Sequence, residues 1–231
     1  MDRNDDINIY NWDEIKDCFV DSDIFLGNGF SIGINSNLNY ASLFDQFLSY
    51  CDSGEQEIFK KFNSTNFEEI QNRLSITTET CDYFAITTKQ ILSAIEKLKL
   101  GLIRSIKDLH PYYSQIDFAT IVKRSVALDT FEDIYTTNYD TFLYHIILQT
   151  MDRHKKENSV KRHQDFFRSN NGDLELTYVK VGGYKNIYYL HGALFIFRNG
   201  LIVNKLRRGN RIDELFDLIK PRLCIRDFMP V

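Results

Sequence analysis

The sequence predicts an α/β fold in which helices flank a mostly parallel sheet and a helical module is inserted between the strands. An apolar segment, a polar turn and a helical pattern follow one another twice, at residues 23–48 and 133–149. Parallel strands need such a crossover helix, so the repeat favours a parallel sheet. Between the two repeats, residues 52–110 contain no convincing strand. Hydrophobic residues make up 43% of the chain, which is enough for a substantial core.

The length of 231 residues suits a single domain, 1–231, that includes the helical module at 52–110. The formal net charge of -4 gives no general argument for binding nucleic acid or a membrane surface. No stretch approaches the ~20 apolar residues of a membrane span, and the polar N-terminus is no signal peptide. We therefore expect a cytoplasmic protein. Four scattered cysteines form no zinc knuckle and predict reduced, mostly buried thiols: Cys18, Cys51, Cys81 and Cys224.

The chain is expected to open with a short helix and a strand. Asn11 and Glu14 have capping-box spacing, and the apolar residues behind them predict a helix from 12 to about 20. A strand at 23–26 leads into a glycine turn. Residues 38–48 then have the apolar spacing of an amphipathic helix packed on the sheet.

The module at 52–110 is expected to be helical throughout. A polar cluster at 63–66 can cap a helix in which Phe67, Ile70 and Leu74 follow at helical spacing. The next helix has a long apolar stripe typical of core packing, which Pro111 ends: Ile91, Leu92, Ile95, Leu98, Leu102, Ile103, Ile106 and Leu109. Residues 115–127 continue the helical pattern.

A second strand is expected at 133–137, with a helix at 141–149 behind it. The polar and charged residues 151–173, which include His154 and His163, predict a solvated surface loop. An arm that binds nucleic acid is the alternative for this loop, although aromatic residues are sparse in it.

Two hairpins are expected next. Gly182-Gly183 separates the strand-like residues 174–181 and 184–190, and Asn199-Gly200 separates 193–197 from 201–204. Residues Lys205–Arg211 predict a basic turn that is either solvated or in contact with phosphate. A helix is expected at 212–219, and the start of a strand at 224–231.

Three polar motifs follow predicted strands. The first is the glycine turn, where glycines let the backbone approach a nucleotide diphosphate and helix N-terminal amides favour the anion. Its candidate residues are Gly27, Asn28, Gly29, Phe30 and Ser31. The other motifs are Thr137-Asn138-Tyr139-Asp140 and His191-Gly192.

Together, these motifs resemble those of a sirtuin-like domain, in which a Gly-Ala-Gly-x-Ser turn, a Gln-Asn-x-Asp motif and a His-Gly occur in this order. Three longer segments look more like those of the bacterial sirtuin-like proteins of antiphage defence, which hydrolyse NAD+. These segments are Leu26–Gly33, Asn66-Phe67-Glu68 and Thr136–Asp140. The resemblance covers roughly residues 20–200. It implies a Rossmann-like sheet, NAD+ as the substrate and no metal.

The resemblance also implies a role for each motif. Cleaving the nicotinamide–ribose bond passes through an oxocarbenium-like sugar, so the site must hold the ribose and position a water. Asn138 can orient both, since its amide donates and accepts, and His191 can accept a proton from a ribose hydroxyl or the water. The catalytic pair is thus Asn138 and His191. The residues expected to bind NAD+ are Gly27, Asn28, Gly29, Phe30 and Ser31 at the diphosphate, Asp140 at the nicotinamide carboxamide, and Thr137 and Gly192.

The sequence departs from the sirtuin pattern in three places. No four-cysteine zinc module follows Gly192, which favours NAD+ hydrolysis over deacylation. The arginine that sirtuins carry after the first turn is missing from 33–37. Only about 40 residues follow His191, which leaves two alternatives: a C-terminally truncated form with an incomplete site, or a site completed by another subunit.

Each candidate also has a structural explanation. Asn138 and Asp140 can simply cap the helix that follows them, and His191 can be a core or turn histidine. His110 and His145 suggest only packing. The joint occurrence of three motifs in order is what favours the functional interpretation.

The leading hypothesis is an NAD+ glycohydrolase that gives nicotinamide and ADP-ribose and acts in antiphage defence by depleting NAD+. A homo-oligomer or a defence-system partner protein would control such an enzyme, and neither a membrane nor nucleic acid is an expected partner. The alternative is a sensor that binds NAD+ or an ADP-ribose derivative without cleaving it. A weaker hypothesis is nucleic-acid binding through the basic stretches 153–168 and 205–211.

Overall fold

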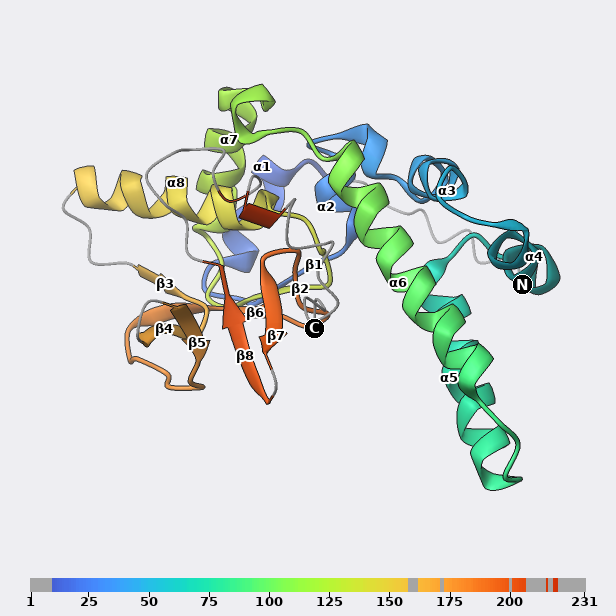
Figure 1. Cartoon of the computed structure of the whole chain (residues 1–231). Helices are drawn as coiled ribbons and strands as arrows, with labels where there is room; N and C mark the ends of the chain where they lie inside the picture. Colours follow the sequence, from blue (N-terminus) through green and yellow to red (C-terminus); the bar gives the residue numbers. More distant parts are fainter. Residues whose placement is uncertain are drawn as a thin grey trace, which may run out of the picture.

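The computed structural model describes residues 10–157, 162–170, 173–199, 201–206, 215, 218 and 219. These residues form an α/β fold with two four-stranded sheets (Figure 1). One sheet is parallel, with the order β1-β2-β6-β3, and the other is antiparallel, with the order β4-β5-β8-β7. The predicted α/β class with a parallel sheet is confirmed.

The element bounds are as follows. The strands are β1 (Ile24–Leu26), β2 (Ile134–Thr136), β3 (Arg162–Gln164), β4 (Phe167–Asn170), β5 (Asp173–Leu176), β6 (Tyr184–Tyr189), β7 (Ile196–Asn199) and β8 (Ile202–Lys205). The α-helices are α1 (Trp12–Ile15), α2 (Asn28–Ile32), α3 (Tyr40–Leu48), α4 (Ser53–Phe62), α5 (Phe67–Tyr83), α6 (Lys89–Leu109), α7 (Phe118–Leu128) and α8 (Phe142–Lys156). Short 3-10 helices are η1 (Lys16–Phe19), η2 (Ser36–Leu38) and η3 (Tyr113–Gln115).

The parallel sheet is covered by α7 and α8, which lie together on one side of it in Figure 1. Leu26, Ile134 and Ile187 come from three adjacent strands and are buried in one cluster with Leu143 and Ile146 of α8. Burying these side chains stabilises the sheet by about 1.5–3 kcal/mol each. Both strands of the predicted repeat are confirmed, and so is the helix behind the second strand.

The antiparallel sheet corrects one of the two predicted hairpins. β7 and β8 form the predicted second hairpin, with Asn199 opposite Ile202. The hairpin predicted around Gly182-Gly183 is wrong, because β5 pairs with β4 and β8 whereas β6 lies between β2 and β3. Both edges of β6 are already occupied by parallel neighbours, so β5 cannot pair there. The chain turns away at Tyr178, whose φ of 54° ends any extended run.

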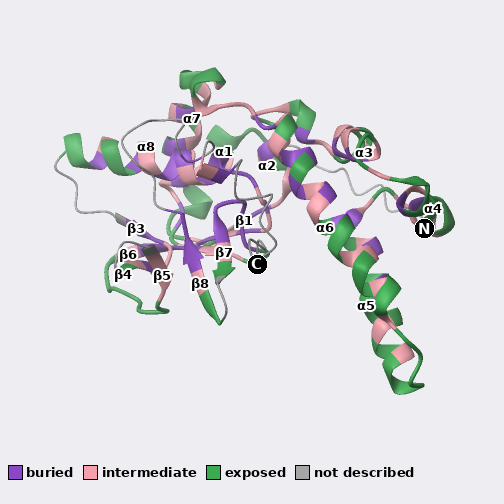
Figure 2. Ribbon diagram, viewed as in Figure 1, coloured by how far each residue is buried: buried purple, intermediate pink, exposed green. Residues whose placement is uncertain are grey.

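The helical segment 53–109 consists of α4, α5 and α6, as the absence of a strand pattern predicts. Its core is an aromatic cluster in which Phe47 of α3 contacts Phe59 and Phe67, with ring centroids 5.3 Å and 4.9 Å away. Each such pair contributes about 0.5–1.5 kcal/mol beyond area burial. In Figure 1, α5 and α6 project from the rest of the molecule, and Figure 2 shows their far ends mostly exposed.

The solvated loop predicted at 151–173 is wrong in its described part. α8 continues to Lys156, and β3 and β4 follow. His154 and His163 are buried, with exposures of 3% and 6%. His154 Nε2 lies 2.8 Å from Asp129 Oδ2, and the Arg153 guanidinium donates to the same oxygen at 2.9 Å. Arg153 and His154 therefore pair with the end of α7, whereas Asp152, Lys155 and Lys156 on the same helix are exposed.

The basic turn predicted from Lys205 is wrong at its first residue, because Lys205 is buried and pairs with Asp165. The rest of that turn and the strand predicted at 224–231 lie outside the described residues. Of the helix predicted at 212–219, residues 215, 218 and 219 are described, and Leu215 and Ile219 are buried in the core with Phe142 and Phe195.

The N-terminal segment agrees with its prediction, since α1 and η1 cover residues 12–19 and the Asn11 amide donates to Glu14 Oε2 at 2.6 Å. The expectation of mostly buried thiols is wrong: Cys18 is exposed, Cys51 and Cys81 are half-buried, and all three are free. Among the residues described above, no helix combines the length and apolar character needed to cross a bilayer.

Candidate active site

The three predicted motifs lie at the carboxyl ends of three adjacent parallel strands. Leu26 of β1 is opposite Thr136 of β2, and Thr136 is opposite Tyr189 of β6. The glycine turn, the Thr137–Asp140 turn and the Leu190–Gly192 turn begin directly after these paired residues. Ligands of open α/β sheets bind at this edge.

The glycine turn leaves open space beside its backbone. A Cβ built on Gly27 or Gly29 would meet nothing within 4 Å. The helix behind the turn differs from the expected one, because it is split into α2, η2 and α3 and α2 has only five residues. So short a helix adds little dipole at the turn. Phe30 packs against the core and under the Arg124 guanidinium, 5.0 Å from its ring centre.

Ser31 and Asp140 connect the first turn to the second. Both are buried, and the Ser31 hydroxyl donates to Asp140 Oδ2. The Phe142 amide donates to Asp140 Oδ1 at 2.8 Å. Asp140 therefore caps the start of α8, as the structural explanation of this residue expected. Its side chain also lines a pocket beside the turns.

Asn138 and Asn28 bring two side-chain amides to the same place. Asn138 Nδ2 donates to the Gly27 carbonyl at 3.0 Å, and the Asn138 backbone amide donates to Thr136 Oγ1 at 3.1 Å. Asn28 Nδ2 is buried and, within the described structure, has no hydrogen-bond partner. Leaving such a donor unsatisfied costs about 1–3 kcal/mol, so it marks a position for an acceptor supplied by a ligand or water.

His191 lies in the tight turn that follows β6. The Gly192 amide donates to the Tyr189 carbonyl at 3.2 Å, and Gly192 has a φ of 75°, a conformation that favours glycine. The His191 side chain is 41% exposed, and its Nδ1 lies 3.4 Å from Glu68 Oε1. Its ring centre lies 6.0 Å from that of Tyr139. His191 is thus a partly exposed turn histidine rather than a core histidine.

Two pockets adjoin these turns and share four lining residues: Glu68, Leu102, Ile106 and Tyr139. The first has a volume of about 80 Å³ and is lined by Asn28, Thr137, Asn138 and Asp140 among others. The second has a volume of about 430 Å³, within the range of small-molecule sites, and is lined by His191. Asn138 and His191 therefore line neighbouring pockets, and Tyr139 borders both.

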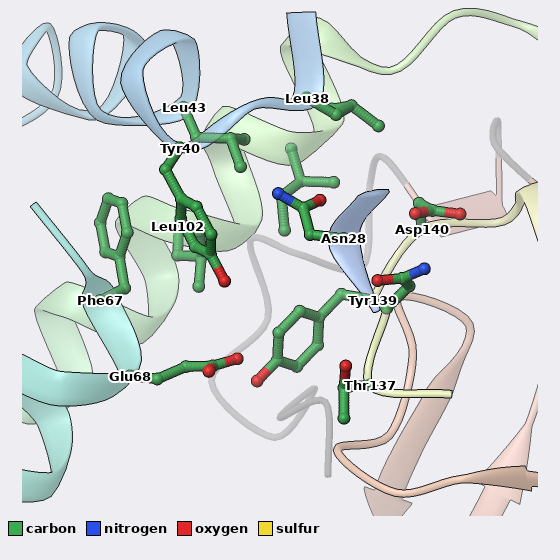
Figure 3. A pocket seen from close by; sticks show the side chains of 12 residues that line it. Asn28, Leu38, Tyr40, Leu43, Phe67, Glu68, Leu102, Thr137, Tyr139 and Asp140 are labelled. Carbon is green, nitrogen blue, oxygen red and sulfur yellow. The ribbon is translucent and has the colours of Figure 1, made fainter. Parts of the chain in front are cut away.

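The polar residues at these pockets that were not predicted as site residues include Tyr40, Glu68 and Tyr139. Figure 3 shows the Tyr40 and Tyr139 hydroxyls pointing toward the Glu68 carboxylate. Burial and Glu68 together raise the pKa of Tyr139 to about 12, so its hydroxyl stays protonated and can donate. Glu68 is the second residue of α5, and its amide donates to Asn66 Oδ1 at 3.0 Å. Because Asn66 marks the start of α5, the sequence does locate Glu68 at a helix end, but nothing in it shows what that end faces.

His110, interpreted from the sequence as a packing residue, supports the second turn from behind. The Thr141 amide donates to His110 Nε2 at 3.3 Å, and His110 Nδ1 lies 2.6 Å from the Pro111 carbonyl. Burial lowers the pKa of His110 and outweighs the opposing effect of Asp140. A neutral imidazole fits these contacts, since Nε2 must accept.

Among the residues that the structure describes, His, Cys, Asp and Glu side chains form no group of three or more able to hold a metal ion. The polar side chains that line the two pockets are amides, hydroxyls, the carboxylates of Glu68 and Asp140, the Lys99 ammonium and the His191 imidazole.

Fold and site together define an α/β protein with a cleft, lined by both polar and apolar side chains, at the carboxyl edge of its parallel strands. The chain belongs to the family described as a domain of unknown function (DUF4917), whose sequence profile matches residues 24–231. A search of the curated proteins finds no match to the chain.

Proposed function

We propose that this protein is an NAD+ glycohydrolase that cleaves the nicotinamide–ribose bond to give nicotinamide and ADP-ribose. The observation that carries the proposal is the placement of the three motif turns, which end adjacent parallel strands at one sheet edge. The resemblance of these motifs to sirtuin-like NAD+-hydrolysing defence proteins supports it. The DUF4917 match by itself specifies no reaction.

The proposed site divides the ligand between the two pockets. The nicotinamide and ribose lie beside Asn28, Thr137 and Asn138, where Asn28 Nδ2 offers a free donor. His191 faces the larger pocket and accepts a proton from water or a ribose hydroxyl. The diphosphate runs past the open backbone of Gly27 and Gly29.

The wider parts of the proposal follow from the same resemblance. The parallel sheet is a Rossmann-like core, residues 52–110 are a module inserted into it, and the enzyme acts in the cytoplasm as an antiphage NAD+-depleting protein. Self-association is its proposed control. Exposed apolar side chains at the far end of the α5–α6 pair favour an interaction surface there: Tyr83, Phe84, Ile86 and Leu92.

The test is release of nicotinamide from NAD+ by the purified chain, compared with His191→Ala and Asn138→Ala. His191 is 41% exposed, so His191→Ala should leave the unfolding temperature nearly unchanged while it lowers release to a small residual rate. Asn138→Ala loses the bond to Gly27 and should also lower stability, so thermal unfolding is recorded for each variant. Asn37→Ala, an exposed asparagine in η2, is the matched control and should release nicotinamide like the wild type.

One observation favours a second candidate function, a sensor that binds NAD+ or an ADP-ribose derivative without cleaving it. Asn138 lines only the first pocket and His191 only the second, with Tyr139 bordering both. If this arrangement persists with ligand bound, the two groups do not act on the same atom. Calorimetry that shows binding of NAD+ or ADP-ribose without nicotinamide release would select the sensor.

A further inference from the structure

Glu68 lies where the helical segment meets the sheet edge. It lines both pockets, and its Oε1 is 3.4 Å from His191 Nδ1, longer than a good hydrogen bond but within the range of an ion pair. The two residues come from α5 and from the turn after β6, so the contact is made by the fold rather than by neighbours in sequence.

The position of Glu68 is fixed by its surroundings. Asn66 Oδ1 caps the start of α5, and the next residue, Phe67, is buried in the aromatic cluster. Ile70, one turn further along, is fully buried. A carboxylate in the first turn of a helix is also favoured by the helix dipole. The backbone beneath Glu68 is therefore anchored, while the carboxylate itself stays in the cleft.

The pair contributes little to stability. Both side chains are more than a third exposed, and exposed ion pairs contribute about 0–1 kcal/mol. The contact instead affects which nitrogen of the His191 imidazole carries the proton. With Nδ1–H directed at a carboxylate, the lone pair of a neutral histidine is on Nε2, which is the form a general base needs.

We propose that Glu68 is the positioning residue of His191, holding Nδ1 so that Nε2 serves as the base. This inference rests on the proposed function. In the reaction, the C1′–N bond breaks and its electron pair neutralises the nicotinamide nitrogen. The oxygen of water bonds to C1′ and its proton goes to His191 Nε2. Glu68 then stabilises the imidazolium until the proton leaves to solvent, so the products are nicotinamide, ADP-ribose and one proton.

The test compares Glu68→Gln with wild type in steady-state NAD+ cleavage. Gln keeps the size of Glu and removes its charge, so kcat should fall by about tenfold or more while KM changes little. Glu79→Gln makes the same chemical change at an exposed site on the same helix and should behave like wild type. Glu68→Ala is a second variant, used if Glu68→Gln does not show wild-type thermal unfolding.

A double variant separates positioning from a general structural effect. At high enzyme concentration, adding Glu68→Gln to His191→Ala should not reduce the residual rate further, because Glu68 acts through His191. The inference is overturned if the rate losses of the two single variants add in the double variant, or if Glu68→Gln has wild-type kinetics in an active enzyme. Neither result contradicts the proposed function. Absence of nicotinamide release by the wild type overturns both.

Discussion

At the scale of residues, one buried hydrogen bond connects two turns that are far apart in sequence. Ser31 donates to Asp140, and both side chains are almost fully buried. Ser31→Ala leaves a buried carboxylate oxygen without its donor, so we expect a loss of about 1–3 kcal/mol in the free energy of unfolding. Urea unfolding measures this loss. Ser36→Ala, at an exposed serine five residues away, should change stability by less than about 0.5 kcal/mol.

Asp129 gives the molecule a predictable response to acid. Burial opposes its ionisation, but hydrogen bonds from His154 and Arg153 prevail and lower its pKa. A lowered pKa means that the pair stabilises the fold above the ordinary value of about 3.9, and that this stability is lost as the pH falls through the folded pKa.

Asp129→Asn should therefore unfold at lower urea concentration than wild type at pH 7, and the gap should persist to about pH 4 and narrow as the pH falls further. Unfolding midpoints from pH 7 to about pH 2 measure this gap. Asp45→Asn, at an exposed site on α3, is the control and should show no gap at pH 7. A gap for Asp129→Asn that stays constant with pH would contradict the role given to the pair.

The candidate site could be predicted only in part at this scale. Asn138, Asp140 and His191 could be identified because each follows an apolar strand, and the structure places all three turns at one edge. Glu68 and Tyr139 could not, because their relevance depends on how α5 lies against the sheet. His154 was misplaced because a run of charged residues has the same composition whether it is solvated or paired.

At the scale of elements, the contact between α3 and α6 depends on Gly101. A Cβ built there would meet the Phe47 ring, which is buried among other aromatic rings and cannot easily move. Overpacking costs about 1–3 kcal/mol and outweighs the gain of about 1 kcal/mol that alanine gives in a helix. Gly101→Ala should thus destabilise the protein by up to about 2 kcal/mol.

Calorimetric or urea unfolding of Gly101→Ala measures this effect. The double variant Gly101→Ala with Phe47→Leu makes room for the methyl group, so its loss should be smaller than the sum of the two single losses. A stabilised Gly101→Ala would mean that α3 and α6 lie further apart than described.

The elements show why sequence patterns succeeded and failed where they did. Helix α6 has a long apolar stripe, α5 begins with three apolar residues at helical spacing, and strands β1 and β2 have polar turns behind them, so these patterns were enough to predict the elements. Strand β6 was assigned to a hairpin because Gly182-Gly183 is a local signal, whereas its true partners, β2 and β3, are set by the sheet. Local signals do not specify which strands pair.

At the scale of the whole molecule, the cleft lies between the carboxyl edge of the parallel sheet and the helical segment. Glu68 of α5 and Leu102 of α6 line it opposite the turns after β1, β2 and β6. The helical segment therefore contributes a wall of the site, in addition to burying its own aromatic cluster. On this account the proposed chemistry needs both parts of the chain.

The central claim is that this cleft cleaves NAD+, and the most direct test is a time course of nicotinamide release by the purified wild-type chain, followed by chromatography over a range of protein concentrations. The account predicts release of nicotinamide and ADP-ribose in equal amounts, largely lost in His191→Ala and retained in Asn37→Ala. Intact NAD+ at every protein concentration, or release that persists unchanged in His191→Ala, would contradict it.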